Sequence, residues 1–415
     1  MTPETAAAHS LLNAAAVRER AQRMLALGLD DELPNFRVDL DRLGDAVDLV
    51  LSVTQKNYPT LDVPFHSRWR HFVTHGHDRR ELLVEELTDP MARARSDFDL
   101  AIVSVLLDAG AGPRWRYRDP IMGGDSARSE GLALASFSMF VSGDFSSHHG
   151  IAQDCVHQLR VDADALANLK TETLCQGFQI TDQNPLSGLE GRAALLRSLG
   201  RLVAQRPEIF ALHDTPRPGG FFDYLVAKAN GAPIPAPLIL SELLVQFGPI
   251  WPSRLMLGGV PLGDCWWHPA LVTADATNGL VPLHKLSQWL TYSLIEPLQW
   301  AGLTVTDIDG LTGLAEYRNG GLFIDTGVLA LRDPAAAARE HDVASALVVE
   351  WRALTVALLD KLAADLRRRL GRDEKSLPLA KILEGGTWAA GRVIARQKRA
   401  DGSPPLKIIS DGTVF

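Results

Sequence analysis

Apolar residues recur at helical spacing along most of this chain of 415 residues. In the segment 39–53, Leu43, Val47 and Leu51 are spaced four apart, and the segment 189–204 carries a similar apolar side. Such spacing predicts amphipathic helices, because residues three and four apart share one helix face. The same reasoning predicts further helices at 5–28, 97–107, 129–140, 221–229, 238–247, 282–294, 343–370 and 379–398.

Strand patterns are few and short. Residues 114–119 alternate arginines with aromatic side chains, and an apolar run leads from a Gly-Gly turn to Asp325. The tail, 404–415, predicts a terminal strand with an Asp-Gly turn. We therefore expect a mainly α protein (α or α+β) with a few short strands, forming one large helical domain over 1–415. If it divides into two lobes, the loops near 180–220 are the expected boundary.

Composition narrows the class of protein. The apolar fraction of 46% and the charged fraction of 22% are typical of globular proteins and exclude wholesale disorder. A net charge of -8 argues against a nucleic-acid binder, since phosphate neutralisation needs a basic surface. Three widely spaced cysteines, no signal-like N-terminus and no apolar run of 18 residues favour a cytoplasmic protein without a membrane segment.

No common nucleotide or hydrolase motif is present. The chain lacks a P-loop, a Gly-x-Gly-x-x-Gly fingerprint, a Gly-x-Ser-x-Gly elbow and a His-Glu-x-x-His pair. ATP hydrolysis, dinucleotide redox chemistry and the commonest hydrolase classes are therefore disfavoured. We expect no cofactor and a small-molecule partner.

The stretch 258–325 is the densest in chemically capable side chains. Pro282 is expected to begin a helix, because it lacks the N–H that would be unsatisfied there. His284 and Gln288 would then share a face and contact one ligand. Lys285, in the first turn beside free backbone N–H groups, would favour an anion. The alternative is an ordinary surface helix start.

Asp264 lies in the same stretch, just before Cys265 and two tryptophans. A carboxylate beside the indole of Trp266 would be partly desolvated, which raises its pKa and suits acid or base catalysis. Alternatively, Asp264 caps a turn. Cys265 and His268 have the spacing of half a zinc site, but the second pair of ligands is absent. A metal-free site is therefore expected, with a zinc site as the alternative.

Glu316, Arg318 and Asp325 surround the glycine turn at 319–321. Asp325 would lie at a strand end, next to a loop, where functional side chains are often displayed. Glu316 and Arg318 could instead form an exposed ion pair that contributes little.

A second unusual stretch is Phe65-His-Ser-Arg-Trp-Arg-His-Phe72. His66, Arg68 and Arg70 are candidates for ligand binding, because arginine binds carboxylates and phosphates in a bidentate manner. The four histidines between positions 66 and 77 also allow a metal site, although His75 and His77 could simply lie in a loop.

Four segments carry a resemblance to a known family. Residues 65–72, Leu262-Gly-Asp264, the run His284-Lys-Leu-Ser-Gln-Trp-Leu-Thr-Tyr-Ser-Leu294 and the tail Ser410-Asp-Gly-Thr-Val-Phe415 resemble the uracil-catabolism protein four family, long catalogued as a domain of unknown function. The resemblance covers nearly the whole chain. It implies a place in uracil degradation and a pyrimidine-derived substrate, and it assigns no catalytic residue.

The leading hypothesis is a hydrolase that cleaves the N-glycosidic bond of a ribosylurea-type compound. The candidate carboxylates are Asp264, Glu316 and Asp325; Arg68, Arg70 and Lys285 would hold a phosphate, and Trp266 and Trp289 would wall the pocket. The hypothesis requires that the 65–72 stretch meets the 258–325 stretch in space. The alternatives are a metal-dependent amidohydrolase using His66, His71, His268 or His284, and a binding or scaffold protein without activity. The oligomeric state stays open.

Overall fold

Helices dominate the computed structural model, which describes residues 2–74, 76–147, 158–213, 215–251 and 255–409. The expectation of a mainly α fold with a few short strands is confirmed. The α-helices are α1 (Pro3–Ser10), α2 (Ala14–Leu29), α3 (Leu43–Asn57), α4 (Glu81–Glu86), α5 (Pro90–Leu106), α6 (Arg128–Val141), α7 (Ala163–Ala167), α8 (Thr171–Gly177), α9 (Leu189–Gln205), α10 (Pro207–Phe210), α11 (Gly220–Ala229), α12 (Ala236–Gln246), α13 (Lys285–Trp300), α14 (Tyr317–Asp325), α15 (Ala346–Leu370), α16 (Leu379–Ile382) and α17 (Trp388–Lys398). Within the described ranges, no helix is long and apolar enough to cross a membrane.

The strands form two-stranded pairs. Five pairs are antiparallel: β1 (Phe36–Val38) with β12 (Leu329–Leu331), β2 (Val73–Thr74) with β3 (His77–Asp78), β4 (Tyr117–Arg118) with β5 (Asp125–Ser126), β7 (Met256–Leu257) with β8 (Val260–Pro261), and β9 (Cys265–Trp267) with β10 (Leu280–Pro282). Two are parallel: β6 (Ile234–Pro235) with β11 (Val305–Thr306), and β13 (Glu340–Asp342) with β14 (Lys407–Ile409). The Asp-Gly turn expected at 411–412 lies outside the described residues.

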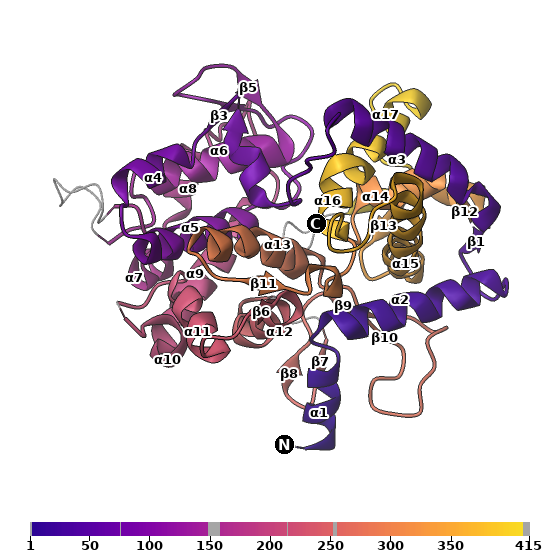
Figure 1. Cartoon of the computed structure of the whole chain (residues 1–415), viewed down its shortest axis with the longest axis horizontal. Helices are drawn as coiled ribbons and strands as arrows, with labels where there is room; N and C mark the ends of the chain where they lie inside the picture. The colour runs from indigo at the N-terminus through magenta and orange to yellow at the C-terminus, as the bar shows by residue number, and fades with distance from the viewer. Residues whose placement is uncertain (1, 75, 148–157, 214, 252–254, 410–415) are drawn as a thin grey trace.

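Helix α13 lies between two groups of helices (Figure 1). Helices α4 to α12 lie on one side of it, and α2, α3 and α14 to α17 lie on the other. Because α13 packs on both α5 and α12, most of its residues are buried, including polar ones such as Gln288, Thr291 and Ser293. Buried apolar residues from segments between Leu12 and Leu406 contact one another and form one connected core. The lobe boundary expected near 180–220 stays a prediction.

The segment 317–325 is a helix, so the strand predicted to end at Asp325 is wrong. Glu316 caps this helix, because its carboxylate accepts the backbone N–H groups of Arg318 and Asn319. The glycine pair that suggested a turn lies inside α14. There, a Cβ on Gly320 would come within 2.7 Å of the Trp351 ring. Glycine is needed at this position for close helix packing rather than for chain reversal.

Pro282 does not begin the central helix, contrary to expectation. It pairs with Cys265 at the end of β10, and α13 begins at Lys285 after His284, whose φ is 46°. The segment expected as one helix at 5–28 is also two helices, α1 and α2. Asn13 separates them and caps α2 through the N–H of Ala16.

Replacing Gly320 with alanine is expected to destabilise the protein by about 1–3 kcal/mol, because the added methyl would overlap Trp351 and Thr355. Urea unfolding measures the change. Gly44→Ala in α3 is the control, since the nearest atom outside the helix backbone, on the Arg369 guanidinium, would lie 3.8 Å from the added Cβ. That variant should gain about 0.4–1 kcal/mol. A stable Gly320→Ala protein would contradict the packing argument.

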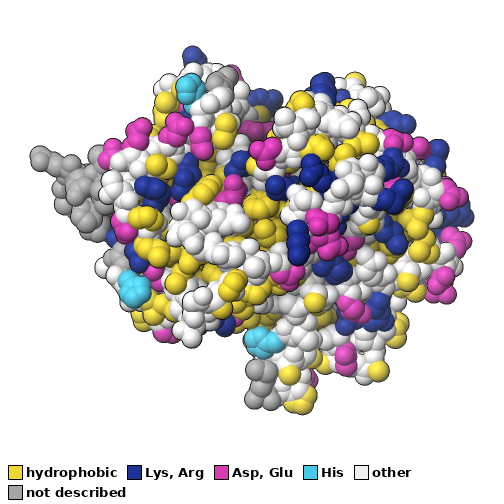
Figure 2. All heavy atoms as spheres, in the orientation of Figure 1, with side chains coloured by type: hydrophobic (Ala, Val, Ile, Leu, Met, Phe, Trp, Pro, Cys, Tyr) yellow, Lys and Arg dark blue, Asp and Glu magenta, His cyan; other side chains and the backbone are white. Residues whose placement is uncertain are grey.

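The surface mixes charges of both signs. On the face drawn in Figure 2, basic and acidic side chains are interspersed instead of gathering by sign. That face offers no extended basic tract of the kind that binds a nucleic-acid backbone.

Candidate functional site

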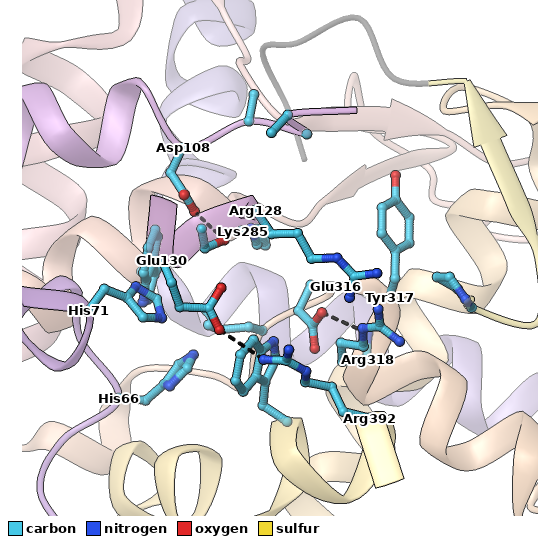
Figure 3. A pocket seen from close by; sticks show the side chains of 18 of the residues that line it. His66, His71, Asp108, Arg128, Glu130, Lys285, Glu316, Tyr317, Arg318 and Arg392 are labelled. Carbon is cyan, nitrogen blue, oxygen red and sulfur yellow. Dashed lines mark hydrogen bonds and ion pairs between the residues drawn. The ribbon is translucent and has the colours of Figure 1, made fainter. Parts of the chain in front are cut away.

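A cavity of about 460 Å³ opens between the two groups of helices. Its charged and aromatic lining comes from segments far apart in the chain (Figure 3). These side chains are His66, His71, Asp108, Arg128, Glu130, Lys285, Trp289, Glu316, Tyr317, Arg318, Trp388 and Arg392. The 65–72 stretch and the 258–325 stretch therefore meet, as the hydrolase hypothesis requires.

Two tryptophans and two histidines form one wall. The ring of His66 lies 6.3 Å from both Trp289 and Trp388, measured between centroids. The ring of His71 lies 5.8 Å from Trp289 and 6.4 Å from Trp388. Trp289 comes from α13 and Trp388 begins α17, so the wall joins the central helix to the group of helices that contains α17. Flat aromatic faces of this kind pack against planar ligands and exclude water.

His66 is oriented by a carboxylate. Its Nδ1 lies 2.8 Å from Oε2 of Glu384, whose other oxygen accepts the hydroxyl of Tyr58 at 3.3 Å. Glu384 belongs to a π-helical turn, Leu383–Thr387, between α16 and α17, and such turns recur at functional sites. With the proton on Nδ1, the Nε2 atom of His66 is left as an acceptor.

Arg68 and Arg70 have protein partners. Arg68 is fully buried and donates to the Oγ atom of Ser104 at 2.6 Å and to Asp108 at 3.2 Å. Arg70 pairs with Glu296 at 2.6 Å. Neither is in the cavity lining.

Burial, together with the charge of Arg68, lowers the pKa of His71 to about 4, so this ring is neutral at pH 7.

Glu316 and Lys285 are both held in a dry part of the site. Burial raises the pKa of the Glu316 carboxyl and lowers the pKa of the Lys285 ammonium. Among the residues that the structure describes, no carboxylate forms an ion pair with Lys285. A carboxyl and an amine that both resist ionisation are suited to proton transfer.

Glu130 is a second carboxylate in the same cavity, and its pKa is shifted in the opposite direction to that of Glu316. It lies in the first turn of α6 and pairs with Arg392 at 2.9 Å. Burial opposes its ionisation, but the protonated form of His71, the backbone N–H of Glu130 itself and Arg392 outweigh that effect, so the pKa of Glu130 lies below its ordinary value. Because His71 is neutral at pH 7, Arg392 is the cation that favours the Glu130 anion there. The cavity thus contains one carboxyl favoured as the acid and another favoured as the anion.

Asp264 lies outside the cavity lining, and its environment is opposite to the one expected. Both of its oxygens bind Arg352 at 2.8 Å, and it also accepts the indole N–H of Trp266 at 2.6 Å. Burial opposes ionisation, yet Arg352 holds the pKa of Asp264 well below its usual range. The prediction of a raised pKa is therefore wrong. The carboxylate joins β9 to α15 and to the start of α13, through the N–H of Lys285.

Three further candidates have structural partners away from the cavity. Asp325 forms a two-point ion pair with Arg399, at 2.8 and 2.6 Å. The Nε2 atom of His284 lies 3.0 Å from the carbonyl oxygen of Leu11. The carbonyl oxygen of the Gln288 side chain accepts the backbone N–H of Thr312 at 2.9 Å. None of these residues lines the cavity, and neither does Trp266.

Glu130, Glu384, Trp388 and Arg392 line or support the cavity but were not singled out from the sequence. Glu130 lies at a predicted helix start, where an acid is ordinarily explained by the helix dipole. Glu384 begins the Glu-Gly-Gly interruption of the last predicted helix. That interruption was the available signal, because glycines inside a helical pattern often have a packing or functional reason.

Potential metal ligands are dispersed. Within the described ranges, no three side chains of His, Cys, Asp or Glu are grouped as a metal site would require. His268 lies 3.4 Å from the buried Glu350, and Cys265 is buried in β9. The expectation that no cofactor is needed stays a prediction.

Comparison with known proteins places the chain in a family. It belongs to the family described as "Protein of unknown function (DUF1688)", whose model matches residues 10–415. It is 42% identical over 427 residues to "Protein urg3" of Schizosaccharomyces pombe (strain 972 / ATCC 24843), with all of both chains covered. It is 38% identical over 420 residues to "Uracil catabolism protein 4" of Lachancea kluyveri, covering 93% of each chain. The family resemblance drawn from the sequence is confirmed.

Proposed function

We propose that this protein acts in the breakdown of uracil-derived compounds, as a hydrolase that cleaves the N-glycosidic bond of a ribosylated ureido compound. The name of the Lachancea kluyveri relative supports the pathway. The reaction is supported by one observation above all. Glu316 and Glu130 line the same cavity, and their surroundings shift their pKa values in opposite directions.

The two carboxyl groups take complementary roles in this reaction. Glu316, protonated, donates its proton to the ureido leaving group as the bond from nitrogen to the anomeric carbon breaks. Glu130, ionised, stabilises the positive charge that develops on the sugar and accepts a proton from the attacking water. The products are the free sugar and the urea compound. Glu130 then releases to solvent the proton that it took from water, and Glu316 takes a proton back from solvent, so both groups return to their starting states.

The remaining lining positions the substrate. Trp289 and Trp388 pack against the planar ureido group and exclude bulk water. The amine of Lys285 hydrogen-bonds to the ureido oxygen. His66, oriented by Glu384, accepts a hydrogen bond from a sugar hydroxyl. These contacts hold the bond to be cleaved between the acid and the anion, which is the main requirement for such a reaction.

Incubation of the purified protein with ribosylurea tests the proposal. We expect equal amounts of urea and ribose, quantified by chromatography, and no cleavage of uridine. Turnover should persist after dialysis against a chelator. Release of ammonia and carbon dioxide, with the glycosidic nitrogen still bound to the sugar, would instead identify an amidohydrolase. Tight binding of ribosylurea without any product would identify a binding protein.

A further inference from the structure

A second cavity, of about 360 Å³, adjoins the first and is strongly basic. Five arginines line it: Arg116, Arg128, Arg318, Arg392 and Arg396. The acidic residues in its lining are Glu130 and Asp401, which leaves an excess of three positive charges. The two cavities share Arg128, Glu130, Arg318 and Arg392, so a ligand in the first can extend into the second.

Most of these arginines are available to a ligand. Among the residues that the structure describes, no carboxylate forms an ion pair with Arg128 or Arg396. Arg318 donates to the carbonyl oxygen of Gly402 at 2.8 Å, which leaves other N–H groups of its guanidinium. Arg392 is the exception, through its pair with Glu130. Burial, followed by the charge of Arg128, lowers the pKa of Arg318, although Glu316 acts in the opposite direction.

The start of α6 adds to the attraction for an anion. Ala127 lies in the cavity lining and precedes this helix of 14 residues, and it provides no side-chain cap for the first backbone N–H groups. Arg128 follows with a φ of 56°, in the left-handed region that non-glycine residues rarely adopt. Such conformations persist where the surroundings require them, often at ligand sites. Figure 3 shows Arg128 and Arg318 extending to the same side of the cavity.

We propose that the second cavity binds a phosphate monoester carried by the sugar of the substrate. This inference rests on the proposed function, because the glycosidic bond of the same molecule must lie beside Glu316. A phosphate monoester has close to two negative charges and three terminal oxygens, and arginine binds such groups by paired N–H donors. The excess of three positive charges matches this group better than a single carboxylate. The preferred substrate is then a ribosylated ureido compound phosphorylated on its ribose.

Calorimetric titration of the full-length protein with ribose 5-phosphate, ribose and inorganic phosphate tests the inference without depending on turnover. Ribose 5-phosphate is expected to bind at least about 100-fold more tightly than ribose, as several charge-assisted hydrogen bonds would require. Inorganic phosphate should bind weakly and compete with ribose 5-phosphate. Arg128→Gln and Arg396→Gln should each lower the affinity for ribose 5-phosphate by about tenfold.

Both variants should fold normally, because Arg128 and Arg396 are exposed and neither forms an ion pair with a carboxylate of the described residues. The matched control is Arg201→Gln, on the exposed side of α9, where the arginine contacts Ser198. It should bind ribose 5-phosphate as the unmodified protein does. Equal affinity for ribose and ribose 5-phosphate, or arginine variants that bind ribose 5-phosphate normally, would overturn the inference.

Two other outcomes separate this inference from the proposed function. If ribose 5-phosphate is preferred but no urea is released from either ribosylurea or its phosphate, the hydrolysis fails and the phosphate site stands. If urea is released while ribose and ribose 5-phosphate bind alike, the hydrolysis stands and the phosphate site fails. Inorganic phosphate that binds without competing with ribose 5-phosphate would indicate a site for a free anion and would also overturn the inference.

Discussion

Replacing Glu316 with glutamine is expected to lower the turnover of a ribosylated ureido substrate by about 10²- to 10⁴-fold, the usual loss when a general acid is removed. Glutamine has nearly the same shape and can still accept one N–H at the start of α14, so substrate binding should survive. Steady-state kinetics measure turnover, and calorimetry measures binding. Turnover equal to that of the unmodified protein would contradict the assignment of Glu316 as the acid.

The pH profile supplies a second readout for the same residue. Because burial raises the pKa of Glu316, its proton is retained above the ordinary carboxyl range, and activity should fall as the pH rises through that pKa. Glu130 has a lowered pKa, so it limits activity only on the acid side. The control is Asp89→Asn, which changes the cap of α5 outside both cavities. Turnover should be unchanged and the effect on stability small, because asparagine caps a helix about as well as aspartate does.

Replacing Asp264 with asparagine is expected to destabilise the fold by about 3–5 kcal/mol, because the change leaves the buried Arg352 without its counter-charge. Urea unfolding measures the loss. The control is Asp31→Asn, which breaks an ion pair with Arg332 in which the Asp31 side chain is 66% exposed. Exposed pairs contribute about 0–1 kcal/mol, so this control should unfold almost normally.

The stability due to Asp264 also depends on pH. Its pKa in the folded protein lies below the value of about 3.9 that an unfolded aspartate has. The stabilisation is therefore complete above that unfolded pKa and is lost as the pH falls toward the folded pKa. The asparagine variant should lack this part of the acid sensitivity. A variant that folds normally yet loses turnover would restore Asp264 as a catalytic candidate.

The sequence by itself determined the fold class and many of the helices. The helices expected at 189–204 and 343–370 correspond to α9 and to α15, which is followed by its C-cap Gly371 with a φ of 60°. These predictions succeed because helical periodicity and glycine caps are local properties of a chain. The density of aromatic, basic and acidic side chains also singles out the 65–72 and 258–325 stretches, which meet at the cavity.

Only the tertiary structure decided which charges face a ligand. Asp264 and Glu316 look equivalent in sequence, yet Asp264 is neutralised by Arg352, 88 positions further along the chain. The strand expected before Asp325 is instead a helix, which Glu316 caps and in which Gly320 packs closely against Trp351. The arginines of the second cavity come from α6, α14 and α17 and from the loop before β4. A charge has a pKa, a partner and a role only in the surroundings that distant segments create, and no local pattern encodes those surroundings.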